Sequence, residues 1–356
     1  MGKKYGLPEH QFPTMVIGSL PRPQWVRDVI SERALGQISE TEADRLLAPA
    51  VLFAIRMQEK AGLDYVSDGE WRRENYVSVF ADRANGFTRS NSPGLHSTHV
   101  TSRVSTRRPI ACEDAAFLRE NTKGRILVPL PSPFTVGRHL WHPELSRSAY
   151  PDRDSFVMDC ADILREEVLS LARLGVDAIQ IDEPWQAWLS NPELYHLNTP
   201  AEIEAGVELA IRTVNQVIDG LDEVFISVHL CHSHGVAADR SPDESVLMEA
   251  VHRIHAHRFA MEFNSPASGG FDKLAQYPAD KILGVGVIDP TSPEAEGVET
   301  VLERAQQAMQ FVAPERIVLN PDCGFATSAH SPRNLDTAYK KLKVMCEAAE
   351  ELRHRS

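Results

Sequence analysis

A histidine and a cysteine two residues apart are the first residues of this chain whose spacing suggests chemistry. His229 and Cys231 lie in the apolar run VFISVHLCH (224–232), which predicts a buried strand. On a strand, residues i and i+2 point to the same face, so one imidazole and one thiolate can reach one ion. Glu262 and Cys323 end two other apolar runs and would complete a set of four ligands. Thiolate and imidazole together favour zinc over magnesium or calcium, which prefer oxygen ligands.

Two other interpretations of these residues stay open. Free cysteine is among the most buried residue types, so Cys231 and Cys323 also fit as small core residues, with His229 as a hydrogen-bonded core histidine. His232 and His234 are alternative imidazole ligands, although His232 should face the opposite side of the strand from Cys231. We assign a structural role to the remaining three of the five cysteines, Cys112, Cys160 and Cys346.

Eight apolar, β-branched runs, each ending in small or polar residues, are the elements expected to position this chemistry. Such runs are typical of strands buried on both faces of a parallel sheet. Helical periodicity lies between several of them, clearest over 154–175, where a glycine ends the pattern. Strands alternating with helices predict a (β/α)8 TIM barrel, an α/β fold, and the absence of a GxGxxG turn makes a doubly wound sheet the weaker choice. The runs cover 15–19, 64–70, 125–133, 177–184, 224–232, 258–266, 281–290 and 316–325, and the further helical stretches cover 40–62, 200–220, 242–257, 293–312 and 333–353.

We expect the whole chain, residues 1–356, to form this one barrel domain. Residues 84–124 do not fit a barrel helix, because they are rich in Ser, Thr, Arg and His. The alternation in HSTHVTSRVSTRRPI predicts a polar, hairpin-like insertion after the second strand. The first forty residues are expected to be an N-terminal elaboration around the first strand.

Polar side chains gather where the predicted strands end. In a TIM barrel the active site lies at the C-terminal ends of the strands, so these residues are candidates for chemistry. Burying many acids without partners is costly, so a cation or a polar ligand is expected among them. The strand-end residues are Ser19, Asp68, Glu70, Asp182, Glu183, His229, Cys231, Glu262, Asp289, Asp322 and Cys323.

These motifs together resemble the cobalamin-independent methionine synthase family, in its catalytic C-terminal barrel and its short single-barrel relatives. Several motifs in order make such a resemblance specific, although any one alone is weak. The resemblance runs from about residue 14 to the C-terminus and implies the same four zinc ligands, His229, Cys231, Glu262 and Cys323. The motifs are IGS (17–19), QEKAGLDYVSDGEWRR (58–73), IQIDEP (179–184), HLC (229–231), MEFNSP (261–266) and NPDCGF (320–325).

The resemblance also implies a reaction, the transfer of a methyl group from a methyltetrahydrofolate-type donor to homocysteine to give methionine. It implies that homocysteine lies against IGS with Ser19, and that Glu70 and Asp182 hold its ammonium group. A thiol with a pKa near 8.5 is mostly protonated at neutral pH, whereas a zinc-bound thiol loses its proton and becomes a nucleophile. The structural alternative for Glu70 and Asp182 is ion pairing with Arg72 or Arg73.

Two departures separate the chain from the full-length synthases. Its 356 residues leave no room for the second, N-terminal barrel of those enzymes. Thr291 stands where the resemblance places a histidine that protonates the folate leaving group, so Asp289 is our candidate for the catalytic acid. Trp185 and Trp188 could stack on a flat donor such as a pterin, although loop packing is the simpler interpretation.

Composition and the ligand types narrow the remaining alternatives. Transfer to a different thiol or from a non-folate donor stays open, as do a barrel metal-hydrolase and a metal-free barrel like the uroporphyrinogen decarboxylases. A thiolate-rich ligand set suits a bound thiol better than a hydroxide. The 37 Lys+Arg against 50 Asp+Glu give a net charge of −13, which argues against a nucleic-acid partner.

The expected partners are therefore small molecules, a thiol and a methyl or alkyl donor. No run approaches the roughly 20 apolar residues of a membrane span, so no membrane is expected. The start, MGKKYGLPEH, lacks the apolar core of a signal peptide, so we expect a cytoplasmic protein. The sequence does not indicate an oligomeric state.

Overall fold

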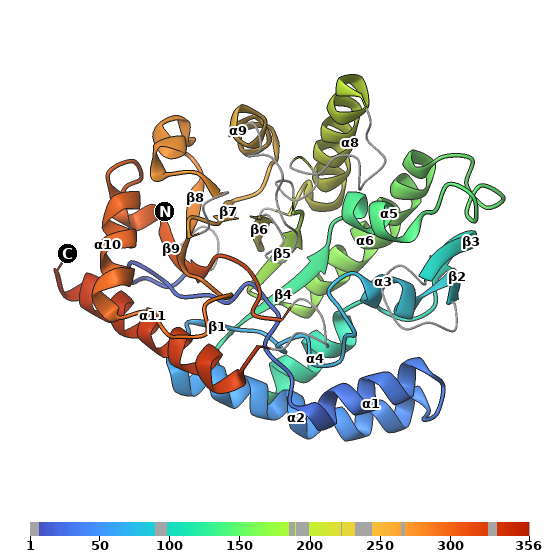
Figure 1. Ribbon diagram of the computed structural model, residues 1–356, viewed down its shortest axis with the longest axis horizontal. Helices are drawn as coiled ribbons and strands as arrows, with labels where there is room; N and C mark the ends of the chain where they lie inside the picture. The colour runs from blue at the N-terminus through green and yellow to red at the C-terminus, as the bar shows by residue number, and fades with distance from the viewer. Residues whose placement is uncertain are drawn as a thin grey trace.

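A curled parallel sheet forms the centre of the molecule (Figure 1). The structure is a computed structural model, and it describes residues 7–89, 98–184, 189, 199–221, 223–231, 244–264, 268–326 and 333–355. Within these residues the sheet has seven strands in the order β1-β4-β5-β6-β7-β8-β9. The strands are β1 (Tyr65–Val66), β4 (Arg125–Pro131), β5 (Ala178–Asp182), β6 (Phe225–Leu230), β7 (Arg258–Met261), β8 (Ile282–Ile288) and β9 (Ile317–Pro321).

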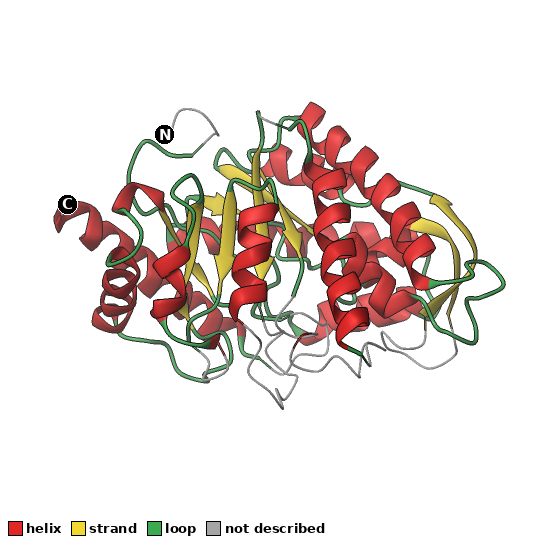
Figure 2. Cartoon of the chain, turned by 90° about the horizontal axis from the view of Figure 1, so that it is seen from above, coloured by secondary structure: helices red, strands yellow, loops and turns green. Residues whose placement is uncertain are grey.

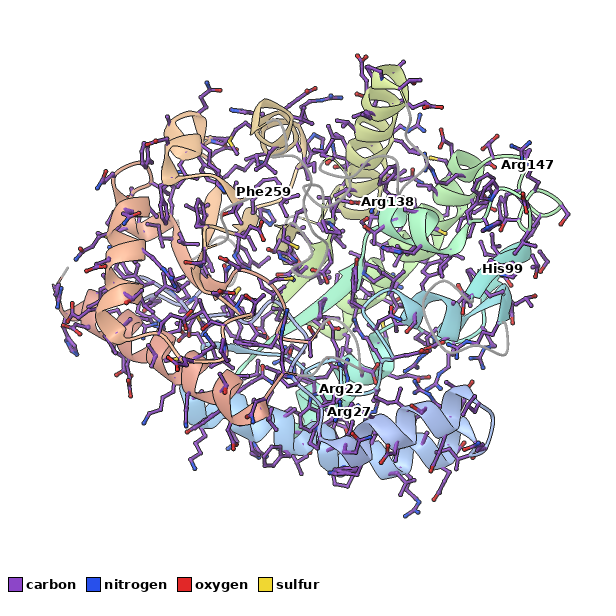
Figure 3. All side chains as sticks on the ribbon, in the orientation of Figure 1. Arg22, Arg27, His99, Arg138, Arg147 and Phe259 are labelled. Carbon is purple, nitrogen blue, oxygen red and sulfur yellow. The ribbon has the colours of Figure 1, made fainter. Side chains whose placement is uncertain are left out.

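Seven of the eight predicted apolar runs contain these strands, so the prediction of buried parallel strands is confirmed for them. Every residue of β5 through β9 is buried. Phe259 of β7, which Figure 3 labels, belongs to the largest fully buried side chains. A sheet covered on both faces accounts for runs that are apolar without alternation.

The prediction of a strand over 15–19 is wrong. Two of its carbonyls accept side-chain hydrogen bonds instead of strand bonds: Ile17 O accepts from Gln180 and Gly18 O accepts from Ser67. The strand-like contact comes one residue earlier, where Thr14 forms a parallel bridge with Leu319 of β9. Thr14 O also accepts from the backbone N of Tyr65 in β1 at 3.2 Å. The segment 13–15 therefore lies between the two edge strands of the sheet.

Long helices surround the strands, as Figure 2 shows. The helix α6 is typical: Asp152 accepts a hydrogen bond from Ser155 N at its start, and Gly175 ends it with a left-handed φ of 75°. Among the described helices, none is long and apolar enough to cross a membrane. The helices that match the predicted periodic stretches are α2 (Glu40–Ala61), α6 (Arg153–Leu174), α8 (Pro200–Ile218), α9 (Glu244–Arg253), α10 (Val298–Met309) and α11 (Leu335–Arg355).

The segment 84–124 holds an antiparallel hairpin followed by a helix. The hairpin strands β2 (Ala84–Arg89) and β3 (Thr98–Thr106) lie at the far side of the molecule from the chain termini (Figure 1). The helix that follows was not expected, and neither were several shorter helices near the strand ends. These additional helices are α1 (Gln24–Ala34), α3 (Ser78–Arg83), α4 (Cys112–Asn121), α5 (Pro133–Leu140) and the 3-10 helix η5 (Phe271–Gln276).

Candidate active site

His229, Cys231 and Cys323 come together at the C-terminal edge of the sheet. Their ligand atoms lie within 4.8 Å of one another, and all three residues are buried. The two sulfurs are 3.7 Å apart, close to the ~3.8 Å that separates two sulfurs on a tetrahedral zinc with Zn–S bonds of about 2.3 Å. A disulfide would need about 2.04 Å. The donor types and their spacing therefore fit a zinc ion.

Two neighbours hold the His229 ring. Nδ1 lies 3.3 Å from Oδ1 of Asp182, and Nε2 lies 3.2 Å from the backbone oxygen of Asp322. A carboxylate on one ring nitrogen fixes the tautomer of a metal-binding histidine, and an ion at Nε2 would replace the proton shared with the Asp322 oxygen. Burial alone would lower the pKa of His229, but hydrogen bonds with Asp182 and Cys323 outweigh it and raise that pKa to about 10. Metal binding would therefore release a proton here.

Glu262, the predicted fourth ligand, lies at the end of β7 and is fully buried. It is outside the group of three residues whose ligand atoms are within 4.8 Å. Its backbone oxygen accepts from Nζ of Lys273 at 2.9 Å. The two alternative imidazoles, His232 and His234, lie outside the described residues.

The IGS segment runs between the Cys323 loop and Glu70. Ser19 O accepts from Phe325 N at 2.9 Å, two residues beyond Cys323. A Cβ on Gly324 would meet Oγ of Ser19 at 2.2 Å, so any larger residue at this position would displace the Ser19 hydroxyl. On the other side, a Cβ on Gly18 would meet Oε1 of Glu70 at 2.5 Å. The predicted carboxylate-binding and ammonium-binding residues are therefore neighbours.

Glu70 is a buried carboxylate on a strained turn. Its φ is 58° and follows a φ of 67° at Gly69, a left-handed pair that costs a non-glycine residue about 1–2 kcal/mol. The turn is held by Nη2 of Arg22, which donates to Glu70 O at 2.7 Å, and by Asp68, which accepts from Glu70 N. Arg22 is labelled in Figure 3. Strain of this kind gathers at functional sites.

The carboxylate of Glu70 is only loosely paired. Nη1 of Arg73 lies 3.9 Å from its Oε1, and its Oε2 is buried without a hydrogen-bond partner among the described residues. Burial raises the pKa of Glu70 to about 7, against the lowering effect of Arg73. Arg72 instead pairs with Asp114 at 3.4 Å. The arginine alternative thus accounts for part of the environment of Glu70 and leaves an acceptor for a cationic ligand.

Asp289, the predicted acid, follows β8 and is half-buried. Its Oδ1 accepts from the backbone N and the hydroxyl of Thr291, at 2.7 and 2.6 Å. Its backbone N donates to Glu296. Thr291, at the position where the resemblance places a histidine, therefore orients the carboxylate of Asp289. Trp185 and Trp188 lie outside the described residues.

Two further residues, Gln180 and Asp322, hydrogen-bond to segments of the site, and neither of them was assigned a role from the sequence. Nε2 of Gln180 donates to Ile17 O at 2.6 Å and to Oδ1 of Asp182 at 2.8 Å. Its position two residues before Asp182 on one strand is a signal that could have identified it. Asp322 was noted only as a strand-end acid, yet it contacts the residues that follow Glu262.

Comparisons with known proteins identify the family of this chain. A family model described as the catalytic domain of the cobalamin-independent synthase matches residues 12–351. The chain belongs to the cobalamin-independent methionine synthase family. It is therefore a methyltransferase, and the resemblance predicted from the motifs is confirmed. A methionine synthase of Pyrococcus furiosus is 28% identical over 350 residues, covering 96% of this chain and 93% of that protein. One of Pyrococcus abyssi is 29% identical over 351 residues, with the same two coverages.

Solved structures extend the family likeness to three dimensions. A B12-independent methionine synthase of Shewanella sp. W3-18-1, in complex with selenomethionine, has a TM-score of 0.76 and 25% identity, covering 97% of this chain and 98% of that one. A methyltransferase of Methanosarcina mazei, at 14% identity, has a TM-score of 0.60 and covers 98% of this chain and 96% of that one. The second likeness concerns the fold alone.

Proposed function

We propose that this enzyme is a zinc-dependent methyltransferase that moves a methyl group from a methyltetrahydrofolate-type donor to the sulfur of homocysteine, giving methionine. The observation that carries the proposal is the 3.7 Å spacing of the Cys231 and Cys323 sulfurs in a buried group with His229. The relatives named methionine synthase support the reaction, and the selenomethionine complex of the Shewanella enzyme supports an amino-acid ligand.

His229, Cys231 and Cys323 would hold the zinc, with Glu262 as the fourth ligand. The bound zinc would supply Lewis acidity that lowers the pKa of a substrate thiol. The carboxyl groups of Glu70 and Asp182 would bind the substrate ammonium. Both are buried, and the ammonium would give each a cationic partner. The substrate carboxylate would lie against the IGS segment with Ser19.

Asp289 is the proposed proton donor to the leaving group of the methyl donor. It is half-buried at the same edge of the sheet as Cys323, and Thr291 holds one of its oxygens. Thr291 also favours a second candidate within the same chemistry. Since it replaces the family histidine, alkyl transfer to another thiol or from a non-folate donor is the alternative reaction.

The proposed architecture is a closed (β/α)8 TIM barrel in which residues 13–15 stand between β9 and β1. The bridge of Thr14 to Leu319 and the bond from Tyr65 N support closure. We propose further that residues 1–356 are a single domain with an insertion over 84–124.

Metal analysis of the purified enzyme tests the proposed function. We expect about one zinc per chain in the wild type and in Cys346→Ser, a control at a buried cysteine of α11, and none in Cys323→Ser. X-ray absorption at the zinc edge should show that the zinc gains a sulfur neighbour when homocysteine is added. A wild-type enzyme that takes up no zinc on reconstitution would contradict the proposal.

A further inference from the structure

Asp322, at the end of β9 and directly before Cys323, has a carboxylate that accepts three hydrogen bonds. Its Oδ1 accepts from Phe263 N at 3.0 Å and from Nδ2 of Asn264 at 2.7 Å. Its Oδ2 accepts from Asn264 N at 2.9 Å. The side chain is fully buried. The donors belong to the two residues that follow Glu262, so the carboxylate of Asp322 fixes the backbone at the exit of β7.

This contact passes across a strand. β8 lies between β7 and β9 in the sheet, so the two strand ends are not hydrogen-bonded neighbours. A Cβ on Gly286 of β8 would meet Oδ1 of Asp322 at 2.0 Å, so glycine is required there. The backbone oxygen of Gly286 also accepts from Nδ2 of Asn264 at 2.9 Å. Because Gly286 has no side chain, the carboxylate of Asp322 can extend past β8 to the residues that follow β7.

A second contact fixes the same segment from its other side. Lys273 of η5 is buried, donates to the backbone oxygens of Glu262 and Ser268, and lies 4.2 Å from the centre of the Phe263 ring. Meanwhile the backbone oxygen of Asp322 lies 3.2 Å from Nε2 of His229. Asp322 therefore contacts or adjoins the segments that carry three of the four proposed ligands.

We propose that Asp322 is a positioning residue that sets the spacing between Glu262 and Cys323 and so prepares the ligand set for zinc. The inference rests on the proposed function, because it takes both residues as ligands. Residues that orient metal ligands without binding the ion typically contribute 10–100-fold in metal affinity. Unlike a ligand, Asp322 acts through backbone N–H groups, and its effect on the segment after Glu262 exists with or without the ion.

Zinc affinity and backbone exchange together test this role. Zinc affinity is measured by competition with a chromophoric chelator for the wild type, Asp322→Ala and Asp322→Asn. Asp322→Ala should bind zinc about 10–100-fold more weakly. Asp322→Asn keeps one acceptor oxygen and nearly the same volume, and should lose less. In chelator-treated protein, the amides of Phe263 and Asn264 should exchange with solvent faster in Asp322→Ala than in the wild type.

Asp64→Asn is the matched control. Asp64 also accepts three hydrogen bonds, from the backbone N and hydroxyl of Thr14 and from Arg353, and its bonds are made away from the ligand group. This variant should lose stability and keep its zinc affinity. Folded Asp322 variants with wild-type zinc affinity would overturn the inference. A wild type that binds no zinc would contradict the proposed function. Separately, unchanged amide exchange at Phe263 and Asn264 in Asp322→Ala would contradict the role of Asp322 as a positioning residue.

Discussion

The buried carboxyl groups of this site change protonation state with pH, and their charge determines whether they attract the substrate ammonium group. Glu70 is the clearest example, because burial raises its pKa to about 7, with Asp182 adding to the rise and Arg73 opposing it. Below that pH the carboxyl of Glu70 is neutral and attracts no ammonium group. Above it the carboxylate is ionised and does.

We therefore expect the affinity for methionine, whose thioether does not titrate, to increase as the pH rises to 7 and to level off above it. The increase approaches at most about tenfold per pH unit for a single proton. Calorimetry between pH 5 and pH 8.5 measures it. Glu70→Gln should bind more weakly and without this dependence, and an equally steep profile in that variant would assign the titration to another group.

Gln180 offers a second prediction, because both of its amide hydrogens are used. In Gln180→Glu, a carboxylate would face the Ile17 carbonyl and the Asp182 carboxylate, and all of these groups are acceptors. We expect the KM for homocysteine to rise at least about tenfold, since a hydrogen bond to a charged group contributes about 1.5–3 kcal/mol. Gln180→Met removes the bonds without adding charge and should lose less. Equal KM values in the two variants would contradict the role of Gln180.

Some of these residues could be predicted from the sequence and some could not. His229 and Cys231 are two residues apart on a strand, so their shared direction follows from local geometry, and the structure brings Cys323 to them. The contacts of Arg22 could not be predicted, because its partners are the backbone oxygens of Glu70 and Ala326, 48 and 304 residues away. No side-chain pattern encodes such a pairing. The roles of Ser19, Glu70, Asp182, Glu262 and Asp289 remain predictions.

At the scale of elements, helix packing beside the sheet depends on one glycine. A Cβ on Gly137 of α5 would meet Cγ2 of Val157 in α6 at 2.1 Å. Alanine favours a helix over glycine by up to about 1 kcal/mol, but overpacking costs about 1–3 kcal/mol. We expect Gly137→Ala to lower the free energy of unfolding by about 1–2 kcal/mol in urea titrations. Adding Val157→Ala should reduce this penalty, and an undiminished penalty in the double-mutant cycle would contradict direct contact.

The elements that were predicted well have strong periodicity, and those that were missed are short. The stretch 154–175 became α6 because its apolar spacing and its final glycine agree. The helix α5 was missed, because the strand predicted over 125–133 took in its cap Ser132 and its first residue Pro133, although this pair is a helix-start signal. The strand predicted over 15–19 failed for a tertiary reason, since its carbonyls serve Gln180 and Ser67.

At the scale of the whole molecule, Asp64 ties the N-terminal segment to the last helix. It accepts from Thr14 and from Arg353 of α11, and Nε2 of His10 lies 2.9 Å from its other oxygen. Because the segment 13–15 lies between β9 and β1, loosening it would expose both edges of the sheet.

We expect Asp64→Ala to lower the free energy of unfolding by about 2–3 kcal/mol, because the hydrogen bonds accepted by the charged carboxylate of Asp64 are lost. Urea titration of the wild type and of Asp64→Ala measures the difference. A change within about 0.5 kcal/mol, the range of an ordinary surface substitution, would show that Asp64 is not needed to hold the termini.

The wide separation of the sulfurs along the chain has a consequence for biosynthesis. Cys231 and Cys323 are 92 positions apart, and only α11 follows β9 among the described elements. In the proposed site, a nascent polypeptide therefore offers a metal His229, Cys231 and Glu262, but not the second thiolate, until Cys323 has been translated. We therefore expect zinc acquisition to follow the synthesis of β9, and chains terminated before Cys323 should remain metal-poor.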